Sequence, residues 1–491
     1  MEERGKSFII LLSAVVILAI LSLFNWEKLS GGYFKSFDLV SDLRDVQKDY
    51  SGGGNNYLDP DLAMLQDESH YEYIDDSVSV GSQSPANDIE EMEKESESKE
   101  ENQEYDYIDS DSEPLTVTGS TTYRMVENAG EIIEDYSVDG SNLSQLRAGL
   151  SEASDKIMRI AVLGDSYIEG DIFTEGIRES LQDVYGGNGI GYTPVYSEIP
   201  GFRHSVRQSC VGFEPIDFRN KSGRNDCLLQ GVAFKAGESA SSTFSGSKKT
   251  PHAESWSETT ILLKAPEGGS LRLKSGSGSE ASWTTYNFDA SDKLQSLKVS
   301  GPTDKISLDG ITPGMVIAGV YLDGTKGVAV DNMSIRGYSG IRHNEISSDL
   351  TRQSRNYIDY RLIILEFGIN ALSSSQTNYN AYGQRMSAVV EYLKKLYPHA
   401  VIMIMGIGDR GEKRGGEMHS MATVTNMIDV QRRVARDTGS LFWDTRSAMG
   451  GEDSVVDWVS NKEINKDYIH LSFLGGKRLS KLFIDALNNS L

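Results

Sequence analysis

One serine, one aspartate and one histidine have the types and the chain order of a nucleophilic triad. Ser166 stands in a Gly-Asp-Ser turn after an apolar run, and Asp467 lies three residues before His470 near the C-terminus. A serine hydroxyl is barely ionised at neutral pH, so it becomes a nucleophile only beside a base. His470 can be that base, because the unperturbed histidine pKa is about 6.5, and Asp467 can orient the imidazole through one ring nitrogen. We therefore predict acyl transfer catalysed by Ser166, Asp467 and His470.

A tetrahedral intermediate on Ser166 carries an oxyanion that needs hydrogen-bond donors. The backbone N–H groups of Ser166 and Gly340 and the side-chain amide of Asn370 are the predicted donors. Each such donor is worth roughly 2.7–4 kcal/mol in the transition state. Gly340 belongs to the stretch Gly-Tyr-Ser-Gly, so Gly337 at its other end is an alternative donor. A glycine is required there because its backbone must lie close to the substrate.

Strands that alternate with helices are needed to bring these stretches together. Three apolar runs predict buried strands, and helical periodicity predicts a helix after each of them. This alternation is typical of a parallel sheet covered on both faces, and open sheets of this kind place their sites beyond the carboxyl ends of the strands. Each of the first three chemical stretches directly follows a predicted strand, and the Asp467–His470 stretch precedes the last helix. The predicted strands are 157–163, 361–367 and 401–407, with weaker ones at 332–336 and 440–444.

The sequence pattern changes in the middle of the chain. From about residue 192 to 331 the helical periodicity disappears, and short β-type runs alternate with Gly, Ser, Pro and Asp. This pattern is typical of an antiparallel sandwich or jelly roll. We therefore predict an α/β domain in two parts, 116–195 and 332–491, interrupted by an all-β insert at 196–331.

The N-terminal quarter predicts an anchor and a tether. Residues 8–24 are uncharged and apolar, long enough at 1.5 Å per residue to span about 26 Å, and Arg4 and Lys6 precede them. We expect 1–26 to be an uncleaved, single-pass transmembrane helix with its N-terminus inside, and a cleaved signal peptide is the alternative. Residues 27–115 are rich in acids and poor in apolar side chains, which predicts a disordered linker. The part after residue 26 is then exported, to the periplasm if the envelope is Gram-negative.

Composition narrows the partners and cofactors. The chain of 491 residues has a formal net charge of −24, and residues 27–114 contribute most of it with 25 acids and six bases. Such a balance disfavours nucleic acid as a partner. Two cysteines are too few for a disulfide-built scaffold or a four-cysteine zinc site, and we predict no cofactor and no metal. In an oxidising compartment Cys210 and Cys227 could pair, and two unpaired thiols are the alternative.

The four chemical stretches, in this order, resemble the four blocks of the SGNH, or GDSL-type, hydrolase superfamily. The resemblance covers about residues 155–200 and 332–491 and implies a flavodoxin-like, three-layer α/β/α domain. Aligned with the second block, the Ser-Gly pair favours Gly340 over Gly337. No G-x-S-x-G motif surrounds Ser166, which disfavours an α/β-hydrolase. The run 164–194 is similar to a subgroup of bacterial peptidoglycan O-acetylesterases that carry an inserted carbohydrate-binding-like β module.

This resemblance implies an exported esterase that removes acetyl or similar small acyl groups from a cell-envelope glycan, either peptidoglycan or another polysaccharide. An O-acetyltransferase that uses the same triad is an alternative, and an acyl-transfer partner in the membrane fits it. A non-catalytic glycan-binding protein is the third hypothesis. Three aromatic residues of the insert, Trp256, Trp283 and Tyr286, could stack on sugar rings or could belong to its core. The sequence does not indicate the oligomeric state.

Overall fold

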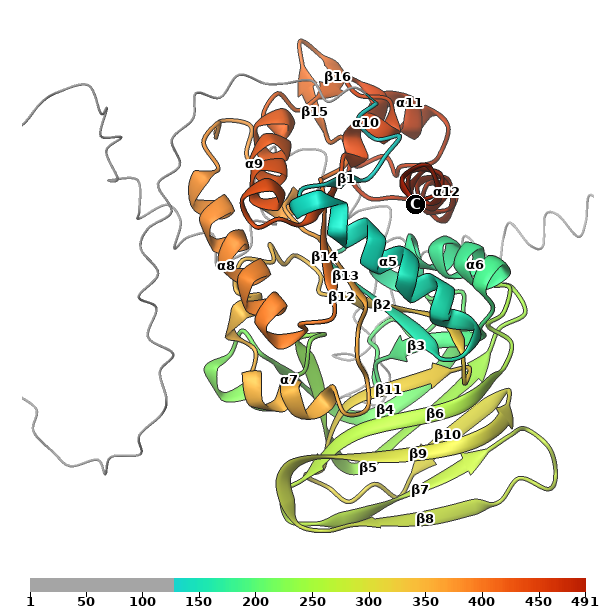
Figure 1. Cartoon of the computed structure of the whole chain (residues 1–491). Helices are drawn as coiled ribbons and strands as arrows, with labels where there is room; N and C mark the ends of the chain where they lie inside the picture. Colours follow the sequence, from blue (N-terminus) through green and yellow to red (C-terminus); the bar gives the residue numbers. More distant parts are fainter. Residues whose placement is uncertain (1–127) are drawn as a thin grey trace, which may run out of the picture. The chain divides into compact units, whose positions relative to one another are not determined.

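The computed structural model describes residues 128–491, so the predicted anchor and linker lie outside the described residues (Figure 1). Within residues 128–491, no helix is both long and apolar enough to cross a membrane. The described chain contains a parallel α/β part and an antiparallel β part. The first supplies the ends of strands at which the predicted site lies, and the second is inserted into it.

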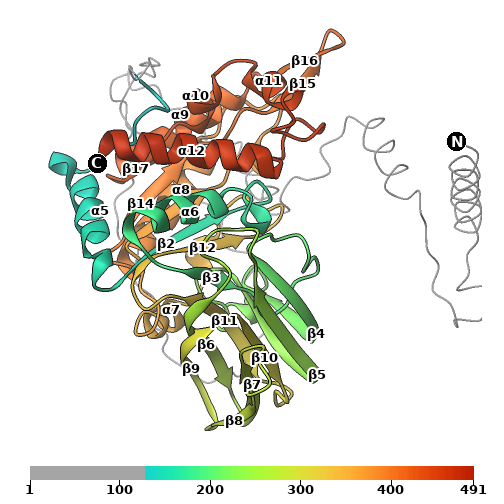
Figure 2. The same cartoon turned by 90° about the vertical axis from the view of Figure 1, so that its right-hand side faces the viewer.

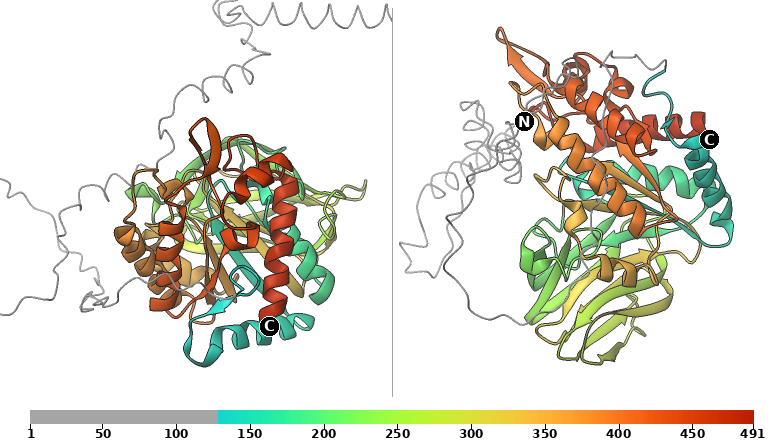
Figure 3. Two further views of the ribbon diagram at one scale, coloured as in Figure 1. Left: turned by 90° about the horizontal axis from the view of Figure 1, so that it is seen from above. Right: turned by 60° about the vertical axis from the view of Figure 1, so that its left-hand side comes forward.

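The α/β part is built on a six-stranded sheet in which all strands but one edge strand are parallel. Helices cover both faces of the sheet, with α8 and α9 on one side and α5, α6 and α12 on the other (Figures 1 and 3). The three-layer α/β architecture predicted from the sequence is therefore confirmed. The strands, in sheet order, are β1 (Glu134–Asp135), β17 (Leu441–Trp443), β14 (Val401–Met405), β13 (Leu362–Glu366), β2 (Ile157–Gly164) and β12 (Gly327–Ser334). The helices are α5 (Ser141–Ser151), α6 (Thr174–Tyr185), α7 (Ser348–Ser354), α8 (Asn380–Leu396), α9 (Val424–Asp437), α10 (Thr445–Met449), α11 (Ser454–Ser460) and α12 (Phe473–Ser490).

The central strands are apolar along their whole length because helices cover both of their faces. In β2, every residue from Met158 to Gly164 is buried, and β13 and β14 are buried throughout. The continuous apolar runs in the sequence reflect this two-sided burial. These apolar runs determine where the strands lie. They therefore also determine the edge of the sheet from which the loops with polar residues emerge.

The antiparallel part is a nine-stranded sheet that forms the lower half of the molecule in Figures 1 and 2. It begins with β3, which pairs with β11, so this sheet starts before residue 196. It ends before β12, which pairs with β2 over eight residues and belongs to the parallel sheet. The remaining strands are β4 (Val206–Asp217), β5 (Val232–Gly246), β6 (Trp256–Ala265), β7 (Gly269–Ser275), β8 (Trp283–Phe288), β9 (Ser291–Thr303), β10 (Lys305–Asp309) and β11 (Val316–Asp323), after β3 (Gly189–Thr193).

Strand β5 bends the sheet around its own core, because it changes partner along its 15 residues. Its first part pairs with β11 and its last part with β10, while β4 follows it along the other side. The inner face encloses a cluster of apolar side chains that includes Phe244 and Trp256. Trp256 is fully buried and Tyr286 packs against the same cluster, so both belong to the core rather than to a sugar-stacking surface. Trp283 is 39% exposed.

Of the two alternatives for Cys210 and Cys227, the structure has the unpaired thiols, because both cysteines are free. Cys227 is buried, and its sulfur lies 3.4 Å from the carbonyl oxygen of Ile216. Ile216 and Cys210 are six residues apart on the same strand, β4, which separates them by roughly 20 Å at 3.3 Å per residue. The turn-rich sequence between the two cysteines concealed this strand.

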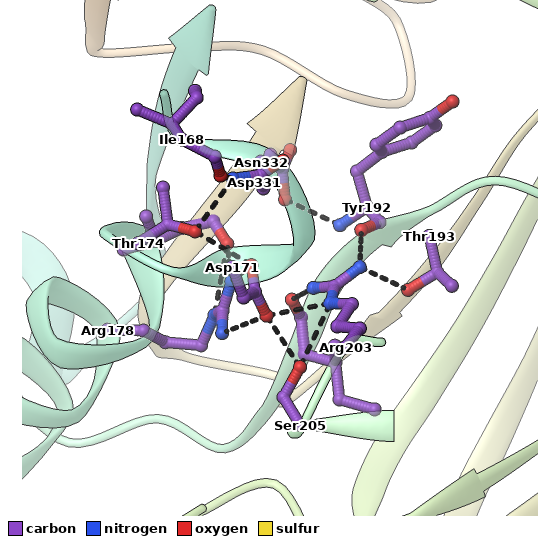
Figure 4. A network of polar contacts seen from close by, with 12 residues as sticks. Ile168, Asp171, Thr174, Arg178, Tyr192, Thr193, Arg203, Ser205, Asp331 and Asn332 are labelled. Atoms are coloured by element: carbon purple, nitrogen blue, oxygen red, sulfur yellow. Dashed lines mark hydrogen bonds and ion pairs between the residues drawn. The ribbon is translucent and has the colours of Figure 1, made fainter. Parts of the chain in front are cut away.

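A buried carboxylate joins the turn after Ser166 to the insert (Figure 4). Asp171 is fully buried and accepts hydrogen bonds from the guanidinium groups of Arg178, on α6, and Arg203, in the loop between β3 and β4. Ser205 and Thr174 donate to the same carboxylate at 2.5 and 2.7 Å. Although burial favours the neutral acid, the two guanidinium groups hold the pKa of Asp171 well below its usual range. Asp171 is therefore a charged connection between the two parts of the chain.

A second buried network connects the two sheets directly. Arg159 of β2 donates to Asp331 of β12 at 2.9 Å and to Asp323 of β11 at 2.5 Å. Tyr360 and the backbone N–H of Tyr192 complete the hydrogen bonding of the Asp331 carboxylate. Because Arg159 pairs with one carboxylate from each sheet, the insert and the α/β part share one set of buried polar contacts.

We expect Asp171→Asn to lower the free energy of unfolding by about 3–5 kcal/mol, because it leaves the guanidinium groups of Arg178 and Arg203 buried without their counter-charge. Urea unfolding measures this loss. Asp183→Asn is the matched control, since Asp183 is 60% exposed and pairs only with His252. An exposed pair of this kind contributes about 1 kcal/mol or less. Equal losses in the two variants would contradict a special role for the Asp171 network.

Candidate active site

Three neighbouring strands end at the same level of the parallel sheet. Gly164, the last residue of β2, is paired with Ser334 of β12 on one side and with Glu366 of β13 on the other. Ser166 follows Gly164 by two residues, while Gly340 and Asn370 lie in the loops that follow the other two strands. The register of the sheet therefore gathers three predicted site residues that are up to 204 positions apart in the sequence.

Ser166, His470 and Asp467 form a continuous hydrogen-bonded chain. The Ser166 hydroxyl oxygen lies 2.9 Å from His470 Nε2, and His470 Nδ1 lies 2.8 Å from Asp467 Oδ2. With Nδ1 protonated and bound to Asp467, Nε2 is the nitrogen that can accept the serine proton. The three predicted triad residues are thus brought together in the arrangement that nucleophilic catalysis requires.

The loop between α11 and α12 holds His470 in place. Asp467 Oδ1 accepts the backbone N–H groups of Ile469 and His470, both at 3.0 Å, while its other oxygen accepts the imidazole. Although partial burial favours the neutral acid, the hydrogen bond and the charge of His470 lower the pKa of Asp467. Tyr468, between them, adopts a left-handed backbone with φ of 60°, which turns the chain so tightly that Asp467 and His470 face each other. The carboxylate is therefore ionised and oriented at neutral pH.

The two alternative glycine donors differ in their surroundings. Both have positive φ, 71° at Gly337 and 86° at Gly340. A Cβ added to Gly337 would meet nothing within 4 Å, whereas one added to Gly340 would lie 2.5 Å from the ring of Phe367. Only Gly340 is thus required to be a glycine by close packing as well as by conformation. The loop that contains Gly340 packs against Phe367, which lies three residues before Asn370.

Asn370 is held in a network that the sequence did not reveal. Its side-chain nitrogen donates to Asp165 Oδ2 at 2.7 Å and to the carbonyl oxygen of Tyr338 at 3.3 Å. The longer of these bonds is the one that a substrate oxyanion can replace while Asp165 keeps the amide oriented. The adjacency of Asp165 to Ser166 was visible in the sequence, but its pairing with Asn370, 205 residues away, depends on the sheet register.

Two buried carboxyl groups lie behind the nucleophile. Asp165 and Glu366 are 0% and 1% exposed. Burial raises the pKa of Asp165 to about 7, and burial together with the nearby Asp165 raises the pKa of Glu366 well above its usual range. Glu366 therefore lies in the site as a neutral acid, and Asp165 titrates near neutral pH.

The segment after β14 borders the site. The backbone N–H of Gly411 donates to the carbonyl oxygen of Tyr468 at 3.0 Å, and Arg410 donates to the carbonyl oxygen of Ile369 at 2.9 Å. Arg410 is therefore a positively charged neighbour of the site that sequence reasoning missed. His419, in the same segment, pairs with Asp453 and not with the triad. Among residues 128–491, no group of three or more His, Cys, Asp and Glu side chains is arranged to hold a metal ion.

The fold and the triad together match what the sequence resemblance implied. A parallel sheet between two layers of helices, with Ser166 after β2 and with Asp467 and His470 before the last helix, is the arrangement that the resemblance to the SGNH, or GDSL-type, hydrolases implied.

A solved structure of a peptidoglycan O-acetylesterase matches 73% of this chain and 98% of its own length, with a TM-score of 0.60 and 23% identity. An acetyl xylan esterase, Axe2 from Geobacillus stearothermophilus, matches 33% of this chain and 73% of its own, with a TM-score of 0.25 and 20% identity. The first likeness establishes the fold, including the antiparallel part. No protein-family model and no curated protein matches the sequence.

We predict that Gly340→Ala lowers kcat/KM for 4-nitrophenyl acetate by about 10²–10³-fold, because the added Cβ would meet the ring of Phe367 and displace the backbone N–H from the oxyanion, which is equivalent to losing one donor. Gly337→Ala is the matched control, because it introduces the same left-handed strain, roughly 1–2 kcal/mol, without the contact to Phe367. It should change kcat/KM by less than about fivefold. Near-UV circular dichroism checks that both variants fold. A larger loss in Gly337→Ala would assign the donor to Gly337.

Asp165 should make stability depend on pH. Its folded pKa of about 7 lies above the unfolded value of 3.8, so between these values the native state binds a proton that the unfolded chain has lost. This group therefore makes the free energy of unfolding fall as pH rises from about 4 to about 7, with no further change above. Asp165→Asn removes that fall, so urea unfolding at pH 5 and pH 8 should show a smaller decrease in the variant. Identical pH slopes in both proteins would contradict the raised pKa.

Proposed function

We propose that this protein is an exported, membrane-tethered serine esterase that removes acetyl or other small acyl groups from a cell-envelope glycan. The observation that carries the proposal is the chain from Ser166 through His470 to Asp467, with contacts of 2.9 and 2.8 Å. The fold shared with a peptidoglycan O-acetylesterase supports it. The tether rests on the apolar sequence of residues 8–24.

In the first half of the reaction, His470 Nε2 takes the proton of the Ser166 hydroxyl while its oxygen attacks the acyl carbon. The resulting oxyanion accepts hydrogen bonds from the backbone N–H groups of Ser166 and Gly340 and from the Asn370 amide. When the tetrahedral intermediate collapses, His470 returns the proton to the sugar oxygen, which leaves as a hydroxyl. The acyl group remains as an ester on Ser166.

In the second half, a water molecule replaces the sugar. His470 Nε2 takes one proton of the water as its oxygen attacks the Ser166 ester, and the same donors stabilise the second oxyanion. Collapse returns the proton to the serine oxygen and releases the acid. Asp467 remains ionised throughout and stabilises the imidazolium that forms twice in each cycle.

The exposure of the triad favours hydrolysis over transfer to a sugar. The side chains of His470 and Asp467 are 40% and 45% exposed, so water reaches the nitrogen that must deprotonate it. An acyltransferase with the same triad has to keep water from its acyl-enzyme. The open site is therefore better suited to the esterase reaction.

We predict that Ser166→Ala lowers kcat for acetate release from an acetylated glycan by about 10⁴–10⁶-fold, because the variant loses covalent catalysis while the rest of the site remains. Acetate is measured directly, with O-acetylated peptidoglycan as the substrate and in the presence of an excess of unacetylated glycan.

Ser460→Ala is the control, since Ser460 is an exposed residue of α11 whose hydroxyl donates only to a carbonyl in its own helix. It should retain full activity. Acetyl groups moved to the unacetylated glycan, with little free acetate, would assign a transferase. Undiminished acetate release from Ser166→Ala would overturn the serine mechanism.

A further inference from the structure

A concave surface on the insert carries positive charge. It has a volume of about 700 Å³, and we call it the cationic groove. Four cationic side chains in its wall give it this name: Arg207, Lys248, Lys249 and Lys305. Such a surface is unexpected in a chain with a net charge of −24.

The pairing of three strands creates this groove. Ser245 of β5 is the register partner of Arg207 on β4 and of Lys305 on β10, so the three residues form one row across adjacent strands. Directly paired residues point to the same face, with neighbouring Cβ atoms about 5 Å apart. A serine between two long cations leaves a hollow with a positive wall on each side. Lys248 and Lys249, just beyond the end of β5, close one end of the hollow.

These cations are not neutralised by the protein. None of the four forms an ion pair with another side chain of the described residues 128–491. The wall also contains two carboxylates, Glu254 and Asp304, of which Asp304 accepts the hydroxyl of Ser277 at 2.6 Å. A fifth cation of the wall, Arg203, pairs with Asp171. The other four cations outnumber the two carboxylates, so the groove is positive, and like charges around a hollow attract an anion.

The groove adjoins a smaller cavity that reaches the turn after Ser166. A cavity of about 200 Å³ shares the walls Arg203, Val206 and Gln208 with it. That cavity extends to Glu169 and Gly170, three and four residues after the nucleophile.

The same loop of the insert also touches the triad's helix. His204, in the wall of the groove, stacks on Phe473 with ring centroids 3.6 Å apart. Phe473 is three residues beyond His470, at the start of α12. A polymer bound in the groove can therefore extend toward the catalytic serine.

We propose that the cationic groove binds anionic groups, carboxylate or phosphate, on the same glycan polymer whose acyl ester reacts at Ser166. The inference rests on the proposed esterase function and adds a substrate class to it: an acidic glycan is preferred over a neutral one. The acidic segment Asp88–Glu113 of the chain itself has complementary charge. The position of the groove, beside a cavity lined by Glu169 and Gly170 of the turn after Ser166, favours the substrate.

Binding without turnover tests the groove separately from the enzyme activity. Calorimetry measures the binding of three polymers to the full chain that carries Ser166→Ala. Polygalacturonate presents carboxylates, poly(ribitol phosphate) presents phosphates, and xylan serves as the neutral polymer. We expect at least one anionic polymer to bind about tenfold more tightly than xylan, and added salt to weaken that binding. Adding Arg207→Gln and Lys305→Gln should remove the preference. Lys235→Gln with Lys293→Gln, two exposed cations elsewhere on the insert, is the control and should retain it.

Kinetics provide the second arm. On acetylated polygalacturonate, Arg207→Gln with Lys305→Gln in the otherwise unchanged chain should raise KM about tenfold with little change in kcat, the sign of lost ground-state binding. Activity on 4-nitrophenyl acetate should be unchanged. Binding without any acetate release would refute the proposed function and leave the groove standing.

Three results would overturn the groove. The first is equal binding of xylan and both anionic polymers, and the second is an equal effect of the control pair. The third is a synthetic Asp88–Glu113 peptide that binds through Arg207 and Lys305 while no polymer does.

Discussion

The carboxylate of Asp171 constrains the whole assembly, because a buried charge cannot lose its partners without a large loss of stability. Removing one member of such a pair destabilises a protein by several kcal/mol, since the remaining charge stays in an apolar surrounding. Here the partners come from different parts of the chain: Arg178 from a helix of the α/β part, and Arg203 from a loop of the insert. The turn that begins at Ser166, five residues before Asp171, is therefore held to the insert. The two cannot move apart without breaking this network.

The network around Arg159 imposes the same constraint on the two sheets. Asp331 and Asp323 lie on strands of different sheets, and both pair with one guanidinium of β2. Burial raises the pKa of Asp323 to about 6, while the positive charge of Arg159 opposes this. Since β2 ends in the Gly-Asp-Ser turn, the strand that delivers the nucleophile is itself fixed to the insert. The distance between the cationic groove and the triad is thus fixed. A polymer that contacts both of them requires such a fixed distance.

The parts of the fold that the sequence predicted are those dominated by local patterning. Apolar runs such as Leu362–Glu366 are buried on both faces and can be recognised as strands. The Asp467–His470 spacing brings the two side chains together within one loop. The separation of the two free cysteines and the early start of the antiparallel sheet, at Gly189, depend instead on long-range pairing. The contact between Asp165 and Asn370 arises only once β2 and β13 are in register, and no local pattern encodes it.

The same long-range packing explains how an exposed triad can still be preorganised. His470 is open to water, so its geometry cannot come from burial. It comes from the Asp467 carboxylate, which binds the imidazole and two backbone N–H groups at once, and from Gly411, which holds the loop through the Tyr468 carbonyl. Asn370, by contrast, is positioned by a buried acid with a pKa of about 7. One side of the site is thus held by a surface loop and the other by the sheet, and the exposed His470 side chain leaves the site accessible to the water that completes hydrolysis.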